Sequence, residues 1–308
     1  MQRRHLLAAA AAASASVLLA ACGGDSTPNL IEALELDADL SLLLEAVRAA
    51  GLEGALNGSG PFTLFAPTNA AFGALLAELG TTKDAVFGDT ALLTAVLTTH
   101  VLGAEVRAAD VPVGRAVTTL QGGIVKPVSV GGGLGLVDGR NRSANVIAAD
   151  IRCSNGVIHK LDRVLLPADK TVVETAIATP GFGILVQAVV AAGLVDALSA
   201  AGPFTVFAPT DEAFAALLDE LGTTAEDLLA NTALLTTVLT YHVLPARVLA
   251  AEVPVGADIT TLQGGTFSVD AGLVITDGAG RTANIVATDV LASNGVIHVI
   301  DRVILPSA

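Results

Sequence analysis

The feature that most constrains this chain is a short segment that occurs twice, from Gly60 to Phe72 and from Gly202 to Phe214. In each copy, an alternating Phe-Thr-x-Phe run predicts a half-buried β-strand. The proline that follows cannot donate a ladder hydrogen bond, so we expect the strand to end there and the next threonine to cap a helix. The residues expected to be structural in this motif are Phe65, Pro67, Thr68 and Phe72, and Phe207, Pro209, Thr210 and Phe214. The chain is therefore predicted to hold two copies of one domain.

The segments around this motif recur in the same order. Helical patterns precede it, and a helix, a strongly apolar helix, a Gln-Gly-Gly turn and two strands around a Ser-Asn-Gly turn follow it. The offset between the copies is about 142 residues up to the Gln-Gly-Gly turn and about 139 beyond it, which we interpret as a gap near Arg140–Ser143. Helices first and strands later, without βαβ alternation, predict an α+β fold. We expect the first domain at residues 30–167 and the second at 171–306.

The first residues have the order of an export signal. Arg3 and Arg4 precede an apolar, alanine-rich run that ends in Leu-Ala-Ala-Cys at residues 19–22. This ending resembles the lipobox of bacterial lipoproteins, which implies a signal peptide over 1–21, a lipid-modified Cys22 and a flexible tether over 22–29. The two arginines also resemble a twin-arginine signal, so the export route stays open. The sequence thus predicts a lipid-anchored, extracytoplasmic protein of the cell envelope, in the periplasm or on the cell surface.

The composition argues against nucleic acid as a partner and against a disulfide framework common to both domains. The formal net charge is −14, and an acidic surface repels phosphate backbones, so we expect no nucleic-acid binding. Aromatic residues make up only 3% of the chain, so the cores must be built mainly from leucine, valine and isoleucine. Cys153 has Ala292 at the matching position of the other copy, so the two domains share no disulfide framework. We expect Cys153 to be a small buried hydrophobic residue.

The sequence carries no constellation of catalytic or metal-binding residues. None of the motif histidines has metal-ligand spacing, and each follows an apolar or β-forming stretch, which predicts a packed imidazole bonded to the backbone. Asp37 and Asp39 open like a calcium loop, but the following glycine and the distal glutamate are missing, so we expect a helix cap. A nucleophile elbow and a phosphate loop are also missing. We therefore expect no cofactor, no metal ion and no enzymatic activity.

Three ordered blocks in each copy resemble the fasciclin (FAS1) family. The Thr-x-Phe-Ala-Pro-Thr-x-x-Ala-Phe segment matches its first signature, Tyr-His at 241–242 matches its Tyr-His motif, and residues 294–301 match its second signature. The first copy departs from this pattern at Thr99, which stands where the family has tyrosine. The motif residues that the resemblance marks for interaction are Tyr241, His242, His100, Asn294, His298, Asn155 and His159.

The resemblance implies both a fold and a function. The fold is a compact β-wedge flanked by helices, in an extracytoplasmic protein that commonly takes part in adhesion or matrix interaction. In animal members the Tyr-His motif is linked to integrin-mediated adhesion, and Thr99 puts that role in question for the first domain. We expect a non-catalytic cell-envelope lipoprotein that acts in adhesion, held to the membrane by its N-terminal lipid and binding an extracellular protein or polysaccharide. The alternative is a receptor-type domain that binds a small ligand or a polysaccharide.

Overall fold

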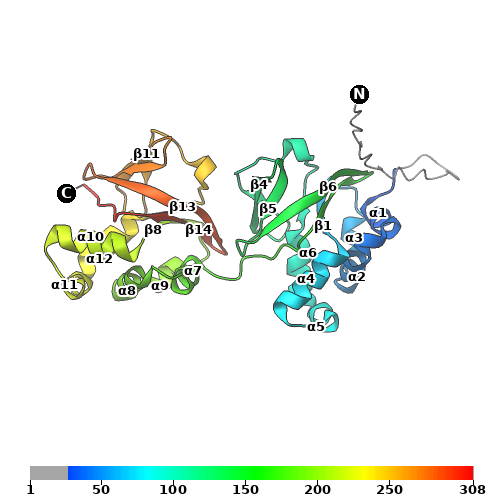
Figure 1. The fold of residues 1–308 in the computed structure, drawn as a ribbon, viewed down its shortest axis with the longest axis horizontal. Coiled ribbons are helices and arrows are strands. Elements are labelled where there is room, and N and C mark those ends of the chain that lie inside the picture. The colour runs from blue at the N-terminus through cyan, green and yellow to red at the C-terminus, as the bar shows by residue number, and fades with distance from the viewer. Residues whose placement is uncertain (1–26, 308) are drawn as a thin grey trace, which may run out of the picture.

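The computed structural model describes residues 27–307 (Figure 1). The predicted signal peptide, the lipidation site Cys22 and most of the tether lie outside the described residues. Within the described range, no helix is both long and apolar enough to cross a membrane. Each half of that range folds as a seven-stranded sheet with helices packed against it, so the predicted α+β fold with two tandem domains is confirmed.

The two domains have matching sets of elements. In the first domain the helices are α1 (Leu30–Leu36), α2 (Ser41–Ala49), α3 (Glu53–Leu56), α4 (Asn69–Leu79), α5 (Lys83–Gly88) and α6 (Thr90–Thr99). Its strands are β1 (Phe62–Pro67), β2 (Val101–Leu102), β3 (Val117–Thr118), β4 (Ile124–Val130), β5 (Gly133–Val137), β6 (Ser143–Cys153) and β7 (Gly156–Leu161). In the second domain the helices are α7 (Val172–Ala178), α8 (Gly183–Ala191), α9 (Val195–Ser199), α10 (Asp211–Leu221), α11 (Ala225–Ala230) and α12 (Thr232–Tyr241). Its strands are β8 (Phe204–Pro209), β9 (Val243–Leu244), β10 (Asp258–Thr260), β11 (Thr266–Val269), β12 (Val274–Thr276), β13 (Thr282–Ala292) and β14 (Gly295–Ile300).

Each sheet has the same strand order. The first sheet runs β2-β1-β7-β6-β5-β4-β3, and the second runs β9-β8-β14-β13-β12-β11-β10 when read from the same edge. The strand of the repeated motif pairs in parallel with the last strand of its domain, β1 with β7 and β8 with β14. The other pairs are antiparallel. The parallel pair brings the first and second signatures side by side, with Phe65 opposite His159 and Phe207 opposite His298.

The motif strands differ from the prediction in their burial. We expected them to be half-buried, but Thr63 and Thr205, on the predicted polar face, are both fully buried. The helices cover one face of the sheet, while the outer strands bend over the other. Each threonine hydroxyl is satisfied by the loop after the short edge strand. Thr63 Oγ1 donates to Ala104 O at 2.7 Å and accepts from Val106 N at 2.8 Å.

The predicted stop and cap of the motif are confirmed. Strands β1 and β8 end at Pro67 and Pro209. Thr68 then accepts a hydrogen bond from the backbone N–H three residues on, and Thr210 does the same, both at 3.3 Å. This is the bond by which an N-cap satisfies one of the free donors of a helix start. One short segment therefore sets the direction of the strand next to the sheet edge and of the helix that covers it.

The gap between the copies lies elsewhere than predicted. We expected it near Arg140–Ser143, but that turn is present in both domains. Asp138 and Asp277, already 139 residues apart, each accept hydrogen bonds from the backbone N–H groups two and four residues later. The missing residues fall in the preceding hairpin, where β4 has seven residues and β11 has four. The hairpin is shortened at the end that carries its own connecting turn, so the turn at Asp138 and Asp277 stays intact.

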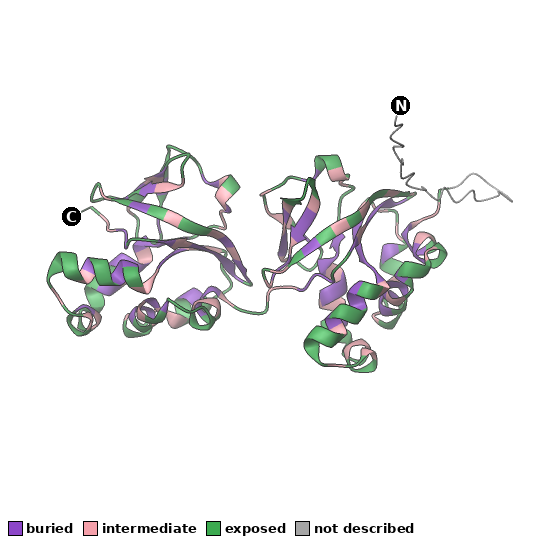
Figure 2. Cartoon of the chain, in the orientation of Figure 1, coloured by how far each residue is buried: buried purple, intermediate pink, exposed green. Residues whose placement is uncertain are grey.

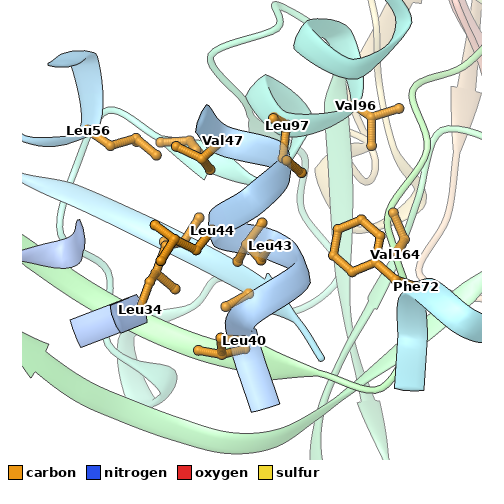
Figure 3. Close-up of a cluster of buried hydrophobic side chains, with 14 of the residues drawn as sticks. Leu34, Leu40, Leu43, Leu44, Val47, Leu56, Phe72, Val96, Leu97 and Val164 are labelled. Carbon is orange, nitrogen blue, oxygen red and sulfur yellow. The ribbon is translucent and has the colours of Figure 1, made fainter. Parts of the chain in front are cut away.

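The helices and the sheet of each domain enclose an apolar core. Figure 2 shows that the buried residues lie where the helices meet the sheet, and Figure 3 shows this cluster in the first domain, with Leu34 among its members. The second core is packed with smaller side chains, because Ala176 replaces Leu34 and Val206 replaces Leu64. An apolar pocket of about 130 Å³ lies at these two residues, between α7, α8 and the sheet. The copies thus share a fold but differ in how completely it is filled.

Candidate functional site

The two domains meet along a contact that combines apolar, ionic and hydrogen-bonded groups. Figure 1 shows the domains side by side along the long axis of the molecule. Ile124 of the first domain packs in one buried cluster with Leu249, Leu291 and Val296 of the second. At the edge of this cluster, Ala116 N–H donates to Glu252 Oε1 at 3.2 Å. The apolar cluster gives the contact a dry centre, which favours a fixed arrangement of the domains.

Two polar contacts fix the register of this interface. Lys126 Nζ lies 3.2 Å from Asp289 Oδ2, and the two side chains are only 14% and 7% exposed. The Asn141 side chain acts as a clamp on β13, because its Nδ2 donates to Leu291 O at 3.0 Å and its Oδ1 accepts from Leu291 N at 2.7 Å. Two hydrogen bonds from one amide define both position and orientation. The ion pair is buried enough for water to screen it weakly.

A cavity of about 310 Å³ lies beside this contact and is walled by both domains. Its lining residues are Thr99, Gln121, Gly122, Gly123, Ile124, Gly139, Pro167 and Ala168 from the first domain and the connection, and Arg247, Leu291, Ala292 and Ser293 from the second. Arg247 is the only charged residue among them. Its Nε is buried and has no hydrogen-bond partner among the described residues. The cavity therefore presents one cation and no carboxylate.

The cavity opens where the two copies differ. In the second domain, Tyr241 is fully buried, and its hydroxyl donates to Thr266 O at 2.6 Å and accepts from Gly278 N at 2.8 Å. Its ring lies so close to Gly265 that a Cβ there would be 3.1 Å from the ring. Thr99 has no ring, and its hydroxyl turns back to Ala95 O at 2.8 Å.

The matching glycine of the first domain shows that the space is open. A Cβ on Gly123 would meet only the Gln121 side chain within 4 Å. The tyrosine ring that stands beside Gly265 therefore has no replacement in the first domain. A wall of the second domain, with Arg247, faces this space instead.

The four motif histidines are buried and bonded to the backbone. His100 Nδ1 lies 2.8 Å from Val96 O, and its Nε2 accepts from Leu165 N at 2.9 Å. His242 repeats this arrangement with Val238 O at 2.7 Å and Ile304 N at 3.1 Å. An Nε2 that accepts carries no proton, so both rings are neutral. Burial lowers the pKa of each of these two rings to about 4.

The histidines of the second signature bind the loop after the edge strand. His159 Nε2 contacts Val106 O at 2.9 Å, and His298 Nε2 contacts Val248 O at 2.9 Å. The Nδ1 atoms accept from the backbone N–H of Asp150 at 3.2 Å and of Asp289 at 3.3 Å. Burial lowers the pKa of His298 as well. Both rings therefore join a core strand to a loop.

Asn155 and Asn294 in turn join the last hairpin of each sheet to the helices. Asn155 Oδ1 accepts from Leu30 N at 2.9 Å, while its Nδ2 donates to Leu56 O and Gly58 O, both at 2.8 Å. The side chain thus ties the turn between β6 and β7 to the start of α1 and the end of α3. All seven motif residues that the resemblance marked for interaction are buried, and the structure does not bring them together in one exposed site.

Cys153 and the acidic residues add no reactive centre to the described part of the chain. The Cys153 thiol is free and packs at the edge of the first core, and burial raises its pKa to about 11, which keeps it protonated. No group of three or more histidine, cysteine or acidic side chains within residues 27–307 is placed to hold a metal ion.

Sequence reasoning missed the residues of the domain contact. Leu249 has Arg107 as its counterpart, and Lys126 has Ser268. Such differences between the copies could have pointed to the interface. A position that is apolar in one copy and charged in the other is not needed by the fold that both copies share. The copies had to be compared position by position to find it.

The comparisons with known proteins agree with this architecture. A fasciclin domain model matches residues 38–167 and 180–306. The chain is similar to protein sll1483 of Synechocystis sp., with 51% identity over 139 residues that cover 44% of this chain and 73% of that protein. It is similar to the transforming growth factor-beta-induced protein ig-h3 of Sus scrofa, with 29% identity over 284 residues, 91% of this chain and 40% of that protein. The chain therefore spans less than half the length of ig-h3.

Among solved structures, a FAS1 domain pair from the insect cell adhesion molecule Fasciclin I aligns with 89% of this chain and 95% of its own, at a TM-score of 0.44 and 18% identity. The family model covers both halves of the described range. The chain belongs to the fasciclin domain family and holds two copies of its domain in tandem.

Proposed function

We propose that this chain is a non-catalytic protein of the cell envelope that acts in adhesion or surface interaction through its two docked fasciclin domains. Membership of the fasciclin family supports this proposal, because fasciclin domains occur in adhesion and extracellular matrix proteins. The docked arrangement also supports it, since two domains held in one orientation present one continuous surface to a partner.

The observation that carries the proposal is a set of exposed apolar side chains that both copies keep. Ile147 and Val286 occupy matching positions on the long strands β6 and β13, and their exposed fractions are 57% and 58%. Val113 and Val255 are another matching pair, with exposed fractions of 54% and 57%. In the first domain, Val113 and Ile147 line one shallow depression. Exposed apolar residues that gather in one place are typical of interaction surfaces.

Binding of the chain to arrays of extracellular matrix proteins and polysaccharides tests this proposal. We expect retention on the array, and a double variant, Ile147→Asp with Val286→Asp, should weaken it by about tenfold or more, because each change removes an apolar contact and adds a charge that must be desolvated. Leu36→Asp is the matched control, since Leu36 is exposed in the first copy and has Ala178 as its counterpart. Retention equal for both variants, or no retention of the unaltered chain, would contradict the proposal.

We further propose that Cys22 carries the lipid that holds the protein to the membrane. The order of basic residues, apolar run and Leu-Ala-Ala-Cys supports this anchor. A Cys22→Ala variant should therefore move from the membrane fraction to the soluble fraction, as followed by fractionation of the host cells. A Cys153→Ala variant serves as control and should stay with the membrane. A Cys22→Ala protein that remains with the membrane would disprove the anchor.

The interdomain cavity favours a second candidate function in the same molecule, reception of a small ligand. Its volume of about 310 Å³ falls at the lower end of the range for small-molecule sites. This size favours a small ligand over a polysaccharide chain.

A further inference from the structure

We propose that the interdomain cavity binds a small aromatic carboxylate, with its ring in the space left beside Thr99 and its carboxylate on Arg247. This inference rests on the second candidate function and is independent of the adhesion role. The cavity and the exposed apolar pairs share no residue, so each proposal can fail alone.

The space for the ligand ring is inferred from the second domain, where a tyrosine ring fills the matching place. There the space between the Gln-Gly-Gly turn and the turn at Gly278 holds the ring of Tyr241, and the hydroxyl bonds to backbone groups on both sides. The first domain keeps both turns, with Gly123 and Gly139 at the glycine positions, but has Thr99 at the tyrosine position. In the first domain the same two turns therefore border a cavity that no ring of the chain fills.

The carboxylate of the ligand is inferred from Arg247. Within residues 27–307, Arg247 takes part in no salt bridge and its buried Nε has no hydrogen-bond partner, so its charge is uncompensated where the residue lines the cavity. The cavity contains no acidic side chain that could supply one. A planar carboxylate matches the donor fork of arginine with two parallel hydrogen bonds. The missing partner of Arg247 is thus of the kind a ligand carboxylate provides.

The copies show that Arg247 is not a requirement of the fold. Its counterpart in the first domain is Glu105, which pairs on the surface with Arg107 at 3.3 Å. Only the copy of this loop that faces the cavity carries the cation. Ser293 and Gln121 add a hydroxyl and an amide to the lining. The site therefore joins a ring-shaped space from one domain to a cation from the other, and it is complete only when the domains are docked.

Calorimetric titration of the full chain with 4-hydroxybenzoate tests the inference. We expect saturable binding of one ligand per chain. Phenol, which lacks the carboxylate, and acetate, which lacks the ring, should each bind at least about tenfold more weakly, because each gives up one half of the site. Arg247→Gln should weaken the binding of 4-hydroxybenzoate by about tenfold or more, since a charge-assisted bidentate contact becomes a neutral one. Glu105→Gln, the same change of charged side chain to amide at the matching position of the first domain, should leave binding unchanged.

A second variant places a side chain of the protein in the space proposed for the ligand ring. Thr99→Tyr introduces the residue that the second domain already holds at this position, so we expect the variant to fold and to lose binding. Thr99→Ser keeps the space open and should bind as the unaltered chain does, which separates loss of the space from loss of the threonine. Absence of saturable binding by the unaltered chain would overturn the inference. Binding that persists in both Arg247→Gln and Thr99→Tyr would overturn it as well.

Discussion

Replacing Asn294 by alanine is expected to lower the free energy of unfolding by about 3–5 kcal/mol, because it leaves several buried backbone groups without a partner at once. Asn294 Oδ1 accepts from Val172 N at 2.9 Å, and its Nδ2 donates to Leu198 O and Ala200 O, both at 2.8 Å. The residue is only 5% exposed, so water cannot easily replace the amide. Each group left unsatisfied costs about 1–3 kcal/mol, and partial relaxation of the α9 end keeps the total below the full sum.

Urea denaturation followed by circular dichroism measures this loss. The matched control is Asn284→Ala, because Asn284 is exposed and its Nδ2 bonds only to the surface carboxylate of Asp301, at 2.6 Å. We expect the control to lose about 1 kcal/mol or less. Equal losses for Asn284→Ala and Asn294→Ala would show that the buried amide does not hold the first and third helices of the domain to the turn between β13 and β14.

Acidification from pH 7 to pH 4 is expected to destabilise the protein by about 3 kcal/mol for each of His100 and His242. Their pKa is about 4 in the folded chain, against an ordinary value of 6.5. The unfolded chain therefore binds more protons between these two values, and stability falls as the pH falls. The contribution of each neutral histidine to the free energy of unfolding is present above pH 6.5 and is lost as the pH falls towards 4. Below pH 4 it does not change further. Each pKa unit corresponds to about 1.4 kcal/mol.

Burial is the main reason for the lowered pKa of both rings, and the acceptor role of Nε2 acts in the same direction. Protonation at this atom would replace the bond from Leu165 N, or from Ile304 N in the second domain, with a clash of two donors. Denaturation at a series of pH values gives the number of protons taken up on unfolding from the slope of free energy against pH. A His242→Asn variant, although less stable at pH 7, should show a slope smaller by about one proton between pH 6 and 5. A slope that does not change in this variant would disprove the assignment.

The sequence predicted the fold through residues whose effect is local. Pro67 and Thr68 act on their own strand end and helix start, and the Asn-Gly turn at Asn155 needs only its own backbone geometry. The burial of Thr63 on the supposedly polar face could not be predicted in the same way. Strand alternation reports one buried face, whereas this strand lies between a layer of helices and the bent outer strands. A polar side chain is tolerated there because its hydroxyl binds a loop that is 41 residues away in sequence.

The candidate site was less predictable, because it depends on two residues that have nothing in common as a sequence pattern. Thr99 was visible in the sequence as a departure from the Tyr-His motif, but the open space that it leaves required the positions of Gly123 and Gly139. Arg247 belongs to no motif at all. Its importance comes from the docking of one domain on the other, and the apolar residues that drive docking, such as Leu249, look like ordinary core residues in a linear sequence.

The contact between the domains is of the head-to-tail kind, in which a face of one copy meets a different face of the next. Contacts of this kind can in principle continue without end and build a filament. Here the outer faces of the pair have been altered, since Ser268 stands in the second domain where the first has Lys126, and Arg107 stands in the first domain where the second has Leu249. Neither the cation nor the apolar anchor of the contact is available at the free ends. This particular contact therefore cannot repeat at the free ends, because sequence divergence has removed two of its residues there.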